Sequence, residues 1–251
     1  MKIPSLQNLS VDYPKLYREM QELQDHNWWF KVHYPAILDI VIPYIKPEMK
    51  VLDLGSASGW STAGLPPTIS RIMFDIRPLA LTLCNNKSLA RICGDAHHIP
   101  LRDSCCDVII CEGLLHQYEA FSPSDIVKEA VRICSPGGVI ISAEPAFKCL
   151  YGSHDVVEGG CRRFKVGELT DLFSGLPVTC NRKTYLHLFV FAPAWFIRRF
   201  RKRDRTDLSM GNRVTNRICV WLGTIERWIG KYLPLPFGIT AVVLMQKNIE
   251  K

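Results

Sequence analysis

The 251-residue sequence lacks the usual marks of secreted and membrane-spanning proteins. Its ten cysteines include one adjacent pair, Cys105-Cys106, and no CxxC motif, so we expect reduced thiols and no disulfide framework. No apolar run is long enough to span a bilayer, and the nearest one, residues 185–197, contains His187 and Pro193. The first residues are polar and show no signal-peptide core. These absences predict a cytoplasmic protein.

The sequence also lacks internal repeats, low-complexity segments and a zinc-site spacing. Cysteines and histidines gather between residues 93 and 116, but their spacing does not match a tetrahedral zinc site, so no metal is expected. The net charge of +7 favours anionic partners. No nucleic-acid-binding motif accompanies this charge, so a nucleic-acid partner is not expected.

What is present is a series of short apolar runs separated by turns and helical patterns. Each run is rich in Val, Ile or Leu and apolar on both faces, as buried parallel strands are. Ser122 and Pro123 mark the start of a helix after the fourth run. The runs cover residues 50–54, 70–75, 90–93, 107–111 and 139–143. Strands that alternate with helices predict a Rossmann-like, doubly wound α/β fold.

The remaining segments predict the domain organisation. Helices are expected at about residues 14–25, 35–45 and 162–173, and further strands at 178–186 and 240–245. We expect one structural domain overall, built from an N-terminal helical lid and a main domain. The lid covers residues 1–47, and the main domain covers 48–251, with a helical, basic insertion at about 187–238.

A glycine-containing turn follows the first apolar run, in residues 51–59. Gly55 and Gly59 permit a tight turn and a close approach of a ligand to the backbone. Asp75 ends the next run, where a carboxylate can accept hydrogen bonds from ribose hydroxyls. Asp95 ends the run after that and is placed to contact an adenine amino group. The three segments predict a nucleoside-binding site at the carboxyl edge of the sheet.

The same pattern also describes a dinucleotide-binding site, but its glycines do not match. A dehydrogenase fingerprint needs glycine at positions 55, 57 and 60, where this sequence has Gly55, Ala57 and Trp60. Trp60 stands where a small residue is needed for close packing of helix and strand. An NAD(P)-dependent oxidoreductase is therefore the less favoured interpretation.

Residues 50–146 resemble the core of class I S-adenosylmethionine-dependent methyltransferases of the UbiE-like, or methyltransferase type 11, group. The motifs that carry the resemblance are the turn at 53–59, Asp75, the segment 94–100, the strand and loop 107–116, and the segment 132–139. Trp28-Trp29-Phe30, Arg163-Phe164 and residues 235–238 are similar to a subgroup often found with glycan or lipid-linked sugar biosynthesis. The resemblance implies a mostly parallel seven-stranded sheet whose last strand is antiparallel, and S-adenosyl-L-methionine as cofactor.

Two departures from the family pattern leave a second interpretation open. Ser56-Ala57-Ser58 stands where relatives usually have Cys-Gly-Thr, so the middle glycine is missing. Pro66-Pro67 shortens the helix that follows. A non-catalytic, methyltransferase-like binding or regulatory protein is therefore the alternative hypothesis.

The resemblance assigns candidate site residues. We expect the cofactor to bind at Asp53, Gly55, Ser56, Ala57, Gly59, Asp75, Ile76, Asp95, Ala96 and Glu112. His116 follows the fourth strand and is the first candidate for a general base, the alternative being a structural histidine. His154, beside Asp155, is the second candidate, the alternative being a solvated loop pair.

The acceptor is predicted only as a class. Methyl transfer to a small-molecule or lipid-linked acceptor is expected, with oxygen favoured. Trp28, Trp29 and Phe30 either close over the site or pack the first helices onto the sheet. The aromatic and basic segment Trp195–Arg203 suits peripheral contact with an anionic membrane, at its inner face, or a solvated basic surface. The oligomeric state is not predicted.

Overall fold

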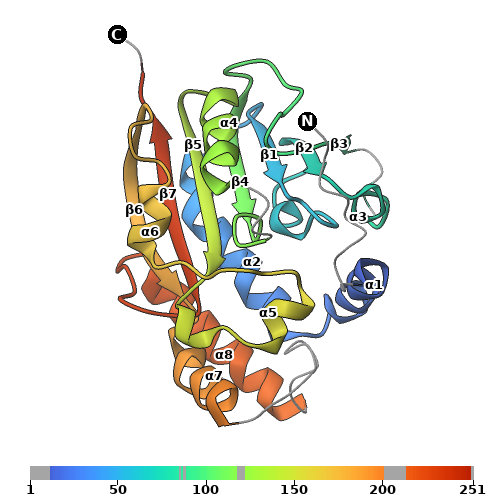
Figure 1. Ribbon diagram of the computed structural model, residues 1–251, viewed down its shortest axis with the longest axis vertical. Coiled ribbons are helices and arrows are strands. Elements are labelled where there is room, and N and C mark those ends of the chain that lie inside the picture. The colour runs from blue at the N-terminus through green and yellow to red at the C-terminus, as the bar shows by residue number, and fades with distance from the viewer. Residues whose placement is uncertain (1–11, 85, 87–88, 118–121, 201–212, 250–251) are drawn as a thin grey trace.

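The computed structural model describes residues 12–84, 86, 89–117, 122–200 and 213–249. Its centre is a seven-stranded sheet in the order β3-β2-β1-β4-β5-β7-β6 (Figure 1). The strands are β1 (Lys50–Leu54), β2 (Ser70–Asp75), β3 (Ala90–Cys93), β4 (Cys106–Glu112), β5 (Cys134–Pro145), β6 (Val178–Leu186) and β7 (Thr240–Lys247). The predicted Rossmann-like sheet is confirmed.

Strand direction changes at one side of the sheet. β1 to β5 are parallel to one another, whereas β7 runs antiparallel to both β5 and β6. The predicted antiparallel last strand is therefore confirmed. Because β1, β4 and β5 are parallel, their carboxyl ends meet at one edge of the sheet, where ligands bind in open α/β folds.

Helices cover both faces of this sheet. α4 (Pro123–Ile133) and α6 (Val166–Asp171) pack on one face, and α2 (Trp28–Val41) packs on the other. α8 (Arg213–Gly230) lies against the outer side of α2. The other helical segments are α1 (Tyr13–Leu23), η2 (Ile42–Tyr44), η3 (Trp60–Thr62), α3 (Pro78–Thr82), η4 (Lys148–Leu150), α5 (Ser153–Val157) and α7 (Leu188–Phe200). The alternating apolar faces of strands and helices form two cores, one on each side of the sheet.

Some element boundaries differ from the expected ones. The second helix was predicted to begin at Pro35, but α2 begins at Trp28, because the Asn27 side chain accepts the Trp29 N–H and caps the helix there. The helix predicted from residue 162 begins only at Val166. β5 begins at Cys134 rather than at Val139, so the segment 135–138 extends the strand. The predicted strands β1, β2, β3 and β6 have the expected bounds.

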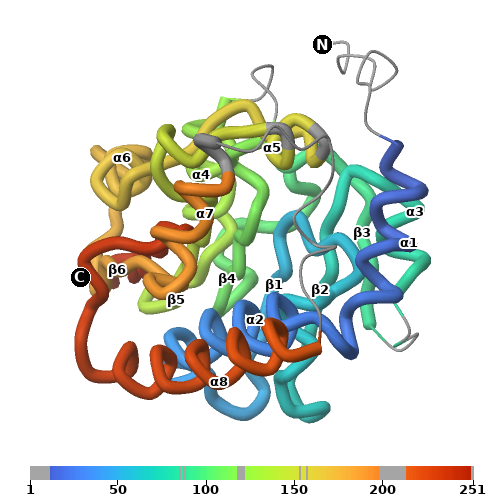
Figure 2. The backbone as a smooth tube through the Cα atoms, turned by 90° about the horizontal axis from the view of Figure 1, so that it is seen from below, coloured from blue at the N-terminus to red at the C-terminus, as the bar shows by residue number. Residues whose placement is uncertain are grey.

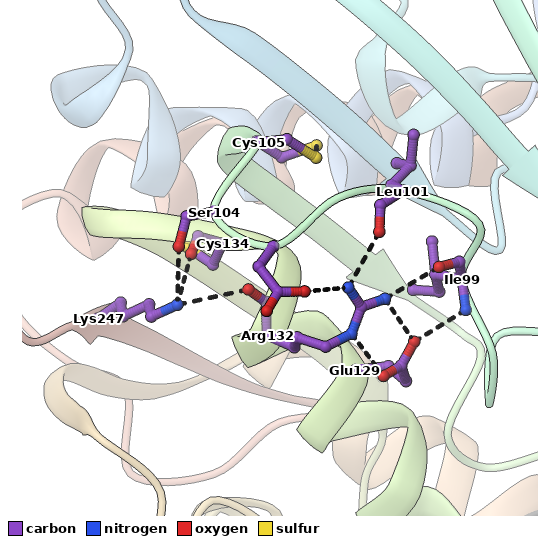
Figure 3. A network of polar contacts seen from close by, with 10 residues as sticks. Ile99, Leu101, Ser104, Cys105, Glu129, Arg132, Cys134 and Lys247 are labelled. Carbon is purple, nitrogen blue, oxygen red and sulfur yellow. Dashed lines mark hydrogen bonds and ion pairs between the residues drawn. The ribbon is translucent and has the colours of Figure 1, made fainter.

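A polar clamp holds the segment that leads from β3 to β4. The Arg132 guanidinium donates to the carbonyl oxygens of Ile99 and Leu101, both at 2.9 Å, and pairs with Glu129 (Figure 3). Glu129 in turn accepts the Ile99 N–H at 2.9 Å. Since this loop continues from Asp95, the clamp on α4 fixes the wall of the sheet edge where that acid lies.

The two long helices of the insertion, α7 and α8, lie at the end of the molecule toward which the parallel strands point (Figure 1), and α8 runs along α2 (Figure 2). Of the aromatic and basic segment, Trp195 and Phe196 are exposed on α7, whereas residues 201–203 lie outside the described residues. No helix in the described part of the chain is long and apolar enough to cross a membrane.

Candidate functional site

A cavity of about 270 Å³ lies at the carboxyl edge of the sheet. Its floor is the turn after β1, one wall is the segment after β3, and α1 and α2 cover it. The far end is bordered by the loop after β4, by α5 and by α7. Eight of the ten predicted cofactor-binding residues line this cavity: Gly55, Ser56, Ala57, Asp75, Ile76, Asp95, Ala96 and Glu112.

The other two predicted residues lie behind the turn. Asp53 is buried, and one of its carboxylate oxygens accepts the Thr62 hydroxyl at 3.1 Å. Its other oxygen has no partner among the described residues. A Cβ on Gly59 would lie 3.1 Å from Met73 Cε, on the side of β2. These two residues support the turn from behind and do not border the cavity.

The turn itself is held in a left-handed conformation. The φ angles of Gly55, Ala57 and Gly59 are 78°, 46° and 82°. The Gly55 and Ser56 N–H groups both donate to the Phe74 carbonyl, which ties the turn to β2. Of these three residues, Ala57 alone carries a side chain. The position where relatives usually have a middle glycine is therefore one whose backbone conformation favours glycine.

Asp75 closes the turn on the side of β2. Its carboxylate accepts the N–H groups of Ala57, at 2.9 Å, and of Arg77, at 2.8 Å. Burial raises the pKa of Asp75, and these N–H groups oppose that rise. Each carboxylate oxygen carries a second lone pair, so the side chain can still accept hydroxyl protons from the cavity.

Asp95 stands on the next wall beside His97. One Asp95 oxygen accepts the His97 backbone N–H at 2.9 Å and lies 2.7 Å from His97 Nδ1. Partial burial raises the pKa of Asp95, but these contacts outweigh it, so that the net shift is downward. The acid is therefore ionised and is a hydrogen-bond acceptor on the wall that follows β3.

The sequence of the sheet core matches a known family. Residues 52–142 match the family model described as a methyltransferase domain. A malonyl-[acyl-carrier protein] O-methyltransferase of Marinomonas sp. is 29% identical over 99 residues, and the alignment covers 36% of this chain and 36% of that relative. The match thus spans about a third of the relative's length.

Two solved structures share the fold. A SAM-dependent methyltransferase from Archaeoglobus fulgidus superposes with a TM-score of 0.61 at 16% identity, over 94% of this chain and all of that one. A chain of the complex between the Haloferax volcanii Trm112 methyltransferase activator and the putative methyltransferase superposes with a TM-score of 0.62 at 16% identity. The superposition covers 96% of this chain and 97% of that one. Over residues 52–142 this chain is thus similar to the methyltransferase domain family, and it shares the class I methyltransferase fold. Its implied cofactor is S-adenosylmethionine.

Polar groups at the edge of the sheet are available to a bound ligand. The hydroxyls of Ser56 and Ser58 are buried at the turn without a partner among the described residues. Both hydroxyls can therefore still form hydrogen bonds. Asp75 lines the cavity at the end of β2, which lies in the sheet between β3, before Asp95, and β4, which ends at Glu112. Asp95, Asp75 and Glu112 therefore follow one another along the carboxyl edge of the sheet.

At the far end of the cavity, His116 forms a buried pair with Glu144. His116 Nδ1 lies 2.9 Å from Glu144 Oε2, and the Glu144 carboxylate also accepts the backbone N–H groups of Leu114, Leu115 and His116. Burial lowers the pKa of His116, but the hydrogen bond and charge of Glu144 outweigh it, so that this pKa is raised. Among the described residues, none hydrogen-bonds His116 Nε2.

The second predicted base, His154, has a different partner from the one that the sequence suggested. His154 Nε2 lies 3.3 Å from Glu158, and both line the cavity. Asp155 instead pairs with the buried Arg163, at 2.8 Å. The adjacency of His154 and Asp155 therefore does not make a proton-transfer pair, because successive residues on the short helix α5 point in different directions.

A second histidine chain reaches the cavity from α2. His33 Nε2 lies 2.9 Å from Glu112 Oε1, and His33 Nδ1 lies 2.9 Å from His187 Nε2. Burial, with His33 nearby, holds the pKa of His187 well below its usual value. The chain is satisfied when neutral His187 donates its Nε2–H to His33 Nδ1 and His33 donates its Nε2–H to the Glu112 carboxylate.

Three residues of these networks were not predicted. His33 and His187 lie 154 residues apart in the chain, so no local pattern links them. Glu144 was detectable in principle, because it is an acid at the end of an otherwise apolar strand. Such an acid is rarely buried without a partner, and that partner is the predicted base, His116.

Proposed function

We propose that this chain transfers the methyl group of S-adenosylmethionine to an oxygen atom of a small-molecule or lipid-linked acceptor, with His116 as the general base. The observation that carries the proposal is the pair His116–Glu144 at the end of the cavity beyond Glu112. A buried carboxylate that receives Nδ1–H fixes the imidazole tautomer and leaves Nε2 as the basic atom.

The cofactor, when bound, supplies an activated methyl group, so the chain mainly has to hold and align the reactants. Asp75 would accept the ribose hydroxyls, Asp95 the adenine amino group, and Glu112 the amino group at the methionine end. His116 Nε2 would take the proton of the acceptor hydroxyl as the oxygen attacks. Glu144 would stabilise the resulting imidazolium, and its charge is the reason that the His116 pKa is raised.

Gly160 leaves room for the proposed base. A Cβ at this position would lie 2.8 Å from His116 Cδ2 and 3.3 Å from Nε2. Any larger residue would push the imidazole out of its place. The Gly160 backbone, paired with Gln117, therefore forms the back of the base's pocket.

We further propose that the N-terminal helices act as a lid within one structural domain, with the insertion at about 187–238 completing the acceptor side. Tyr13 and Tyr17 of α1 and Trp28 and Trp29 of α2 line the cavity, which supports a covering role. Trp29 also stacks on His33 at a centroid distance of 4.1 Å, so its ring takes part in packing as well.

The acceptor is proposed to be apolar near its reacting end. α7 contributes Val190, Pro193, Ala194 and Ile197 to the cavity. The exposed Trp195 and Phe196 on the same helix support a peripheral position at an anionic membrane face. A lipid-linked alcohol would satisfy both observations.

Calorimetric titration with S-adenosylmethionine and S-adenosylhomocysteine tests the cofactor assignment. We expect micromolar binding, about −8 kcal/mol, that is lost in Asp75→Asn and kept in Asp171→Asn, an exposed acid on α6. Failure of the folded wild type to bind either compound would favour the non-catalytic alternative.

Transfer itself is tested with tritium-labelled cofactor and a panel of alcohols, amines and lipid-linked sugars. The proposed base is supported if the wild-type protein labels an alcohol and His116→Asn abolishes this labelling but still binds the cofactor. Equal labelling by wild type and His116→Asn would overturn that role, and labelling of amines alone would overturn the oxygen assignment.

A further inference from the structure

The outward face of α8 carries an apolar stripe. Its members follow one another at intervals of four and three residues, so they lie along one side of the helix. They are Val214, Ile218, Trp221, Ile225, Trp228 and, just after the helix, Tyr232. Each is between 39% and 72% exposed. A continuous exposed stripe of this kind marks a surface that binds something.

The helix cannot roll to bury this stripe, because its opposite face is fixed on α2. A Cβ on Gly223 would lie 2.4 Å from Val32 Cγ1, so the two backbones approach as closely as glycine allows. The Asn216 side chain accepts the Trp28 N–H at 2.7 Å, and Arg227 pairs with Asp39 at 2.9 Å. The stripe therefore faces outward in the folded protein.

The exposed charges around the stripe are positive. They belong to Arg213, Arg217 and Lys231, and of these Lys231 also lies 3.7 Å from the partly buried Asp39 of α2. The one acid in residues 213–233 is Glu226, whose carboxylate is turned inward and accepts the backbone N–H groups of His187 and Phe189. A second copy of this face would bring like charges together, whereas an anionic surface would complement them.

The side chains themselves favour a lipid surface. Trp221, Trp228 and Tyr232 combine a large apolar body with a polar hydrogen-bonding group, as residues at membrane–water interfaces do. The rings of Trp228 and Tyr232 lie 5.9 Å apart and form one aromatic end of the stripe. A helix with an apolar aromatic face and basic flanks lies in the plane of such an interface.

We infer that α8 is the docking surface of this protein on an anionic lipid bilayer. α7 and α8 lie at the same end of the molecule (Figures 1 and 2), and α7 lines the cavity. Docking through α8 would therefore hold this end of the molecule, which includes α7, close to the bilayer. This inference deepens the proposed function by naming the surface that collects a lipid-linked acceptor, but docking itself requires no methyl transfer.

Co-sedimentation with vesicles tests the inference. The probes are vesicles of phosphatidylglycerol and phosphatidylcholine in equal amounts and vesicles of phosphatidylcholine alone. We expect binding to the first, weakened on the order of tenfold by Trp221→Ser with Trp228→Ser. Arg213→Gln with Arg217→Gln should weaken it about thirtyfold at low salt. The matched control is Ile249→Ser, an exposed apolar residue that lies beside Gly137 at the opposite edge of the sheet.

Two further measurements separate the outcomes. Titration with S-adenosylmethionine without vesicles shows that each variant is folded, and it reports on the proposed function independently of docking. Absence of binding to the anionic vesicles by wild-type protein that binds the cofactor would overturn the inference. The inference would also be overturned if the wild-type protein sediments as a dimer and Trp221→Ser with Trp228→Ser makes it a monomer. A second copy of the chain would then cover the stripe.

Discussion

His33 Nε2 lies 2.9 Å from Glu112 Oε1, which joins the helix α2 to the carboxyl end of β4 across the cavity. Both His33 and its second partner, His187, are buried. A histidine from the N-terminal region therefore orients the acid that we assign to the cofactor's amino group. The lid and the site are one hydrogen-bonded unit.

Replacement of His33 by Ala should loosen this unit. The change leaves Glu112 and His187 without their shared partner, so we expect the free energy of unfolding to fall by about 1–3 kcal/mol. Cofactor affinity should fall as well, because Glu112 loses its orientation. Urea unfolding and calorimetry measure the two effects.

His26→Ala is the control, since His26 is exposed near the start of the same helix. Gln at position 33 can still donate to Glu112 and should restore part of the affinity. Unchanged cofactor binding in His33→Ala would show that His33 has no positioning role.

The pH titration of His116 should depend on Glu144. The carboxylate favours the imidazolium, so His116 should titrate above the ordinary histidine value of about 6.5. Glu144→Gln removes the negative charge and should move the His116 pKa downward. NMR of the histidine ring signals measures this, with His116→Asn to assign the signal.

Glu168→Gln, at an exposed position that caps α6, should leave this titration unchanged. A His116 pKa that does not fall in Glu144→Gln would contradict the charge coupling. It would also remove the physical reason for assigning the base to this histidine.

The strained turn should respond to glycine with a gain in stability. Ala57 has a φ of 46°, and the left-handed conformation costs a residue with a Cβ about 1–2 kcal/mol. Ala57→Gly relieves this strain but adds freedom to the unfolded chain, so we expect a net gain of about 0.5–1 kcal/mol. Thermal unfolding provides the measurement.

Ala63→Gly is a control with the opposite expected sign. Ala63 follows the short helix η3 in right-handed helical geometry, with a φ of −59°, and is exposed. Glycine there should destabilise the protein. A loss of stability in Ala57→Gly would mean that the turn does not hold residue 57 in the left-handed region.

The buried ion pair between Arg163 and Asp155 predicts a large loss of stability on truncation. Arg163 also donates to the Ala146 carbonyl at 3.1 Å, so it connects α5 to the end of β5. Arg163→Ala leaves the Asp155 carboxylate buried without this partner, which should lower the free energy of unfolding by about 3–5 kcal/mol. Arg162→Ala, at a half-exposed neighbouring position, should change the free energy of unfolding only slightly. Equal losses of stability in the two variants would rule out the Arg163–Asp155 pair as the cause.

Local pattern determined the sheet, the turn and the acids that line it. Short apolar runs bounded by turn residues were sufficient to place β1, β2 and β3, because buried parallel strands are apolar on both faces. The same pattern locates Asp75, which ends β2, and Asp95, which follows the end of β3. The sequence alone also shows that Ala57 replaces a glycine of the family pattern.

Only the tertiary structure decided which distant groups meet. The pairs His33–Glu112 and His116–Glu144 join residues 79 and 28 positions apart, and no periodicity encodes such contacts. The α8 stripe shows the same limit, because regular apolar spacing ordinarily predicts a buried face. Here Gly223 and Asn216 occupy the contact with α2, and that packing turns the stripe toward the outside.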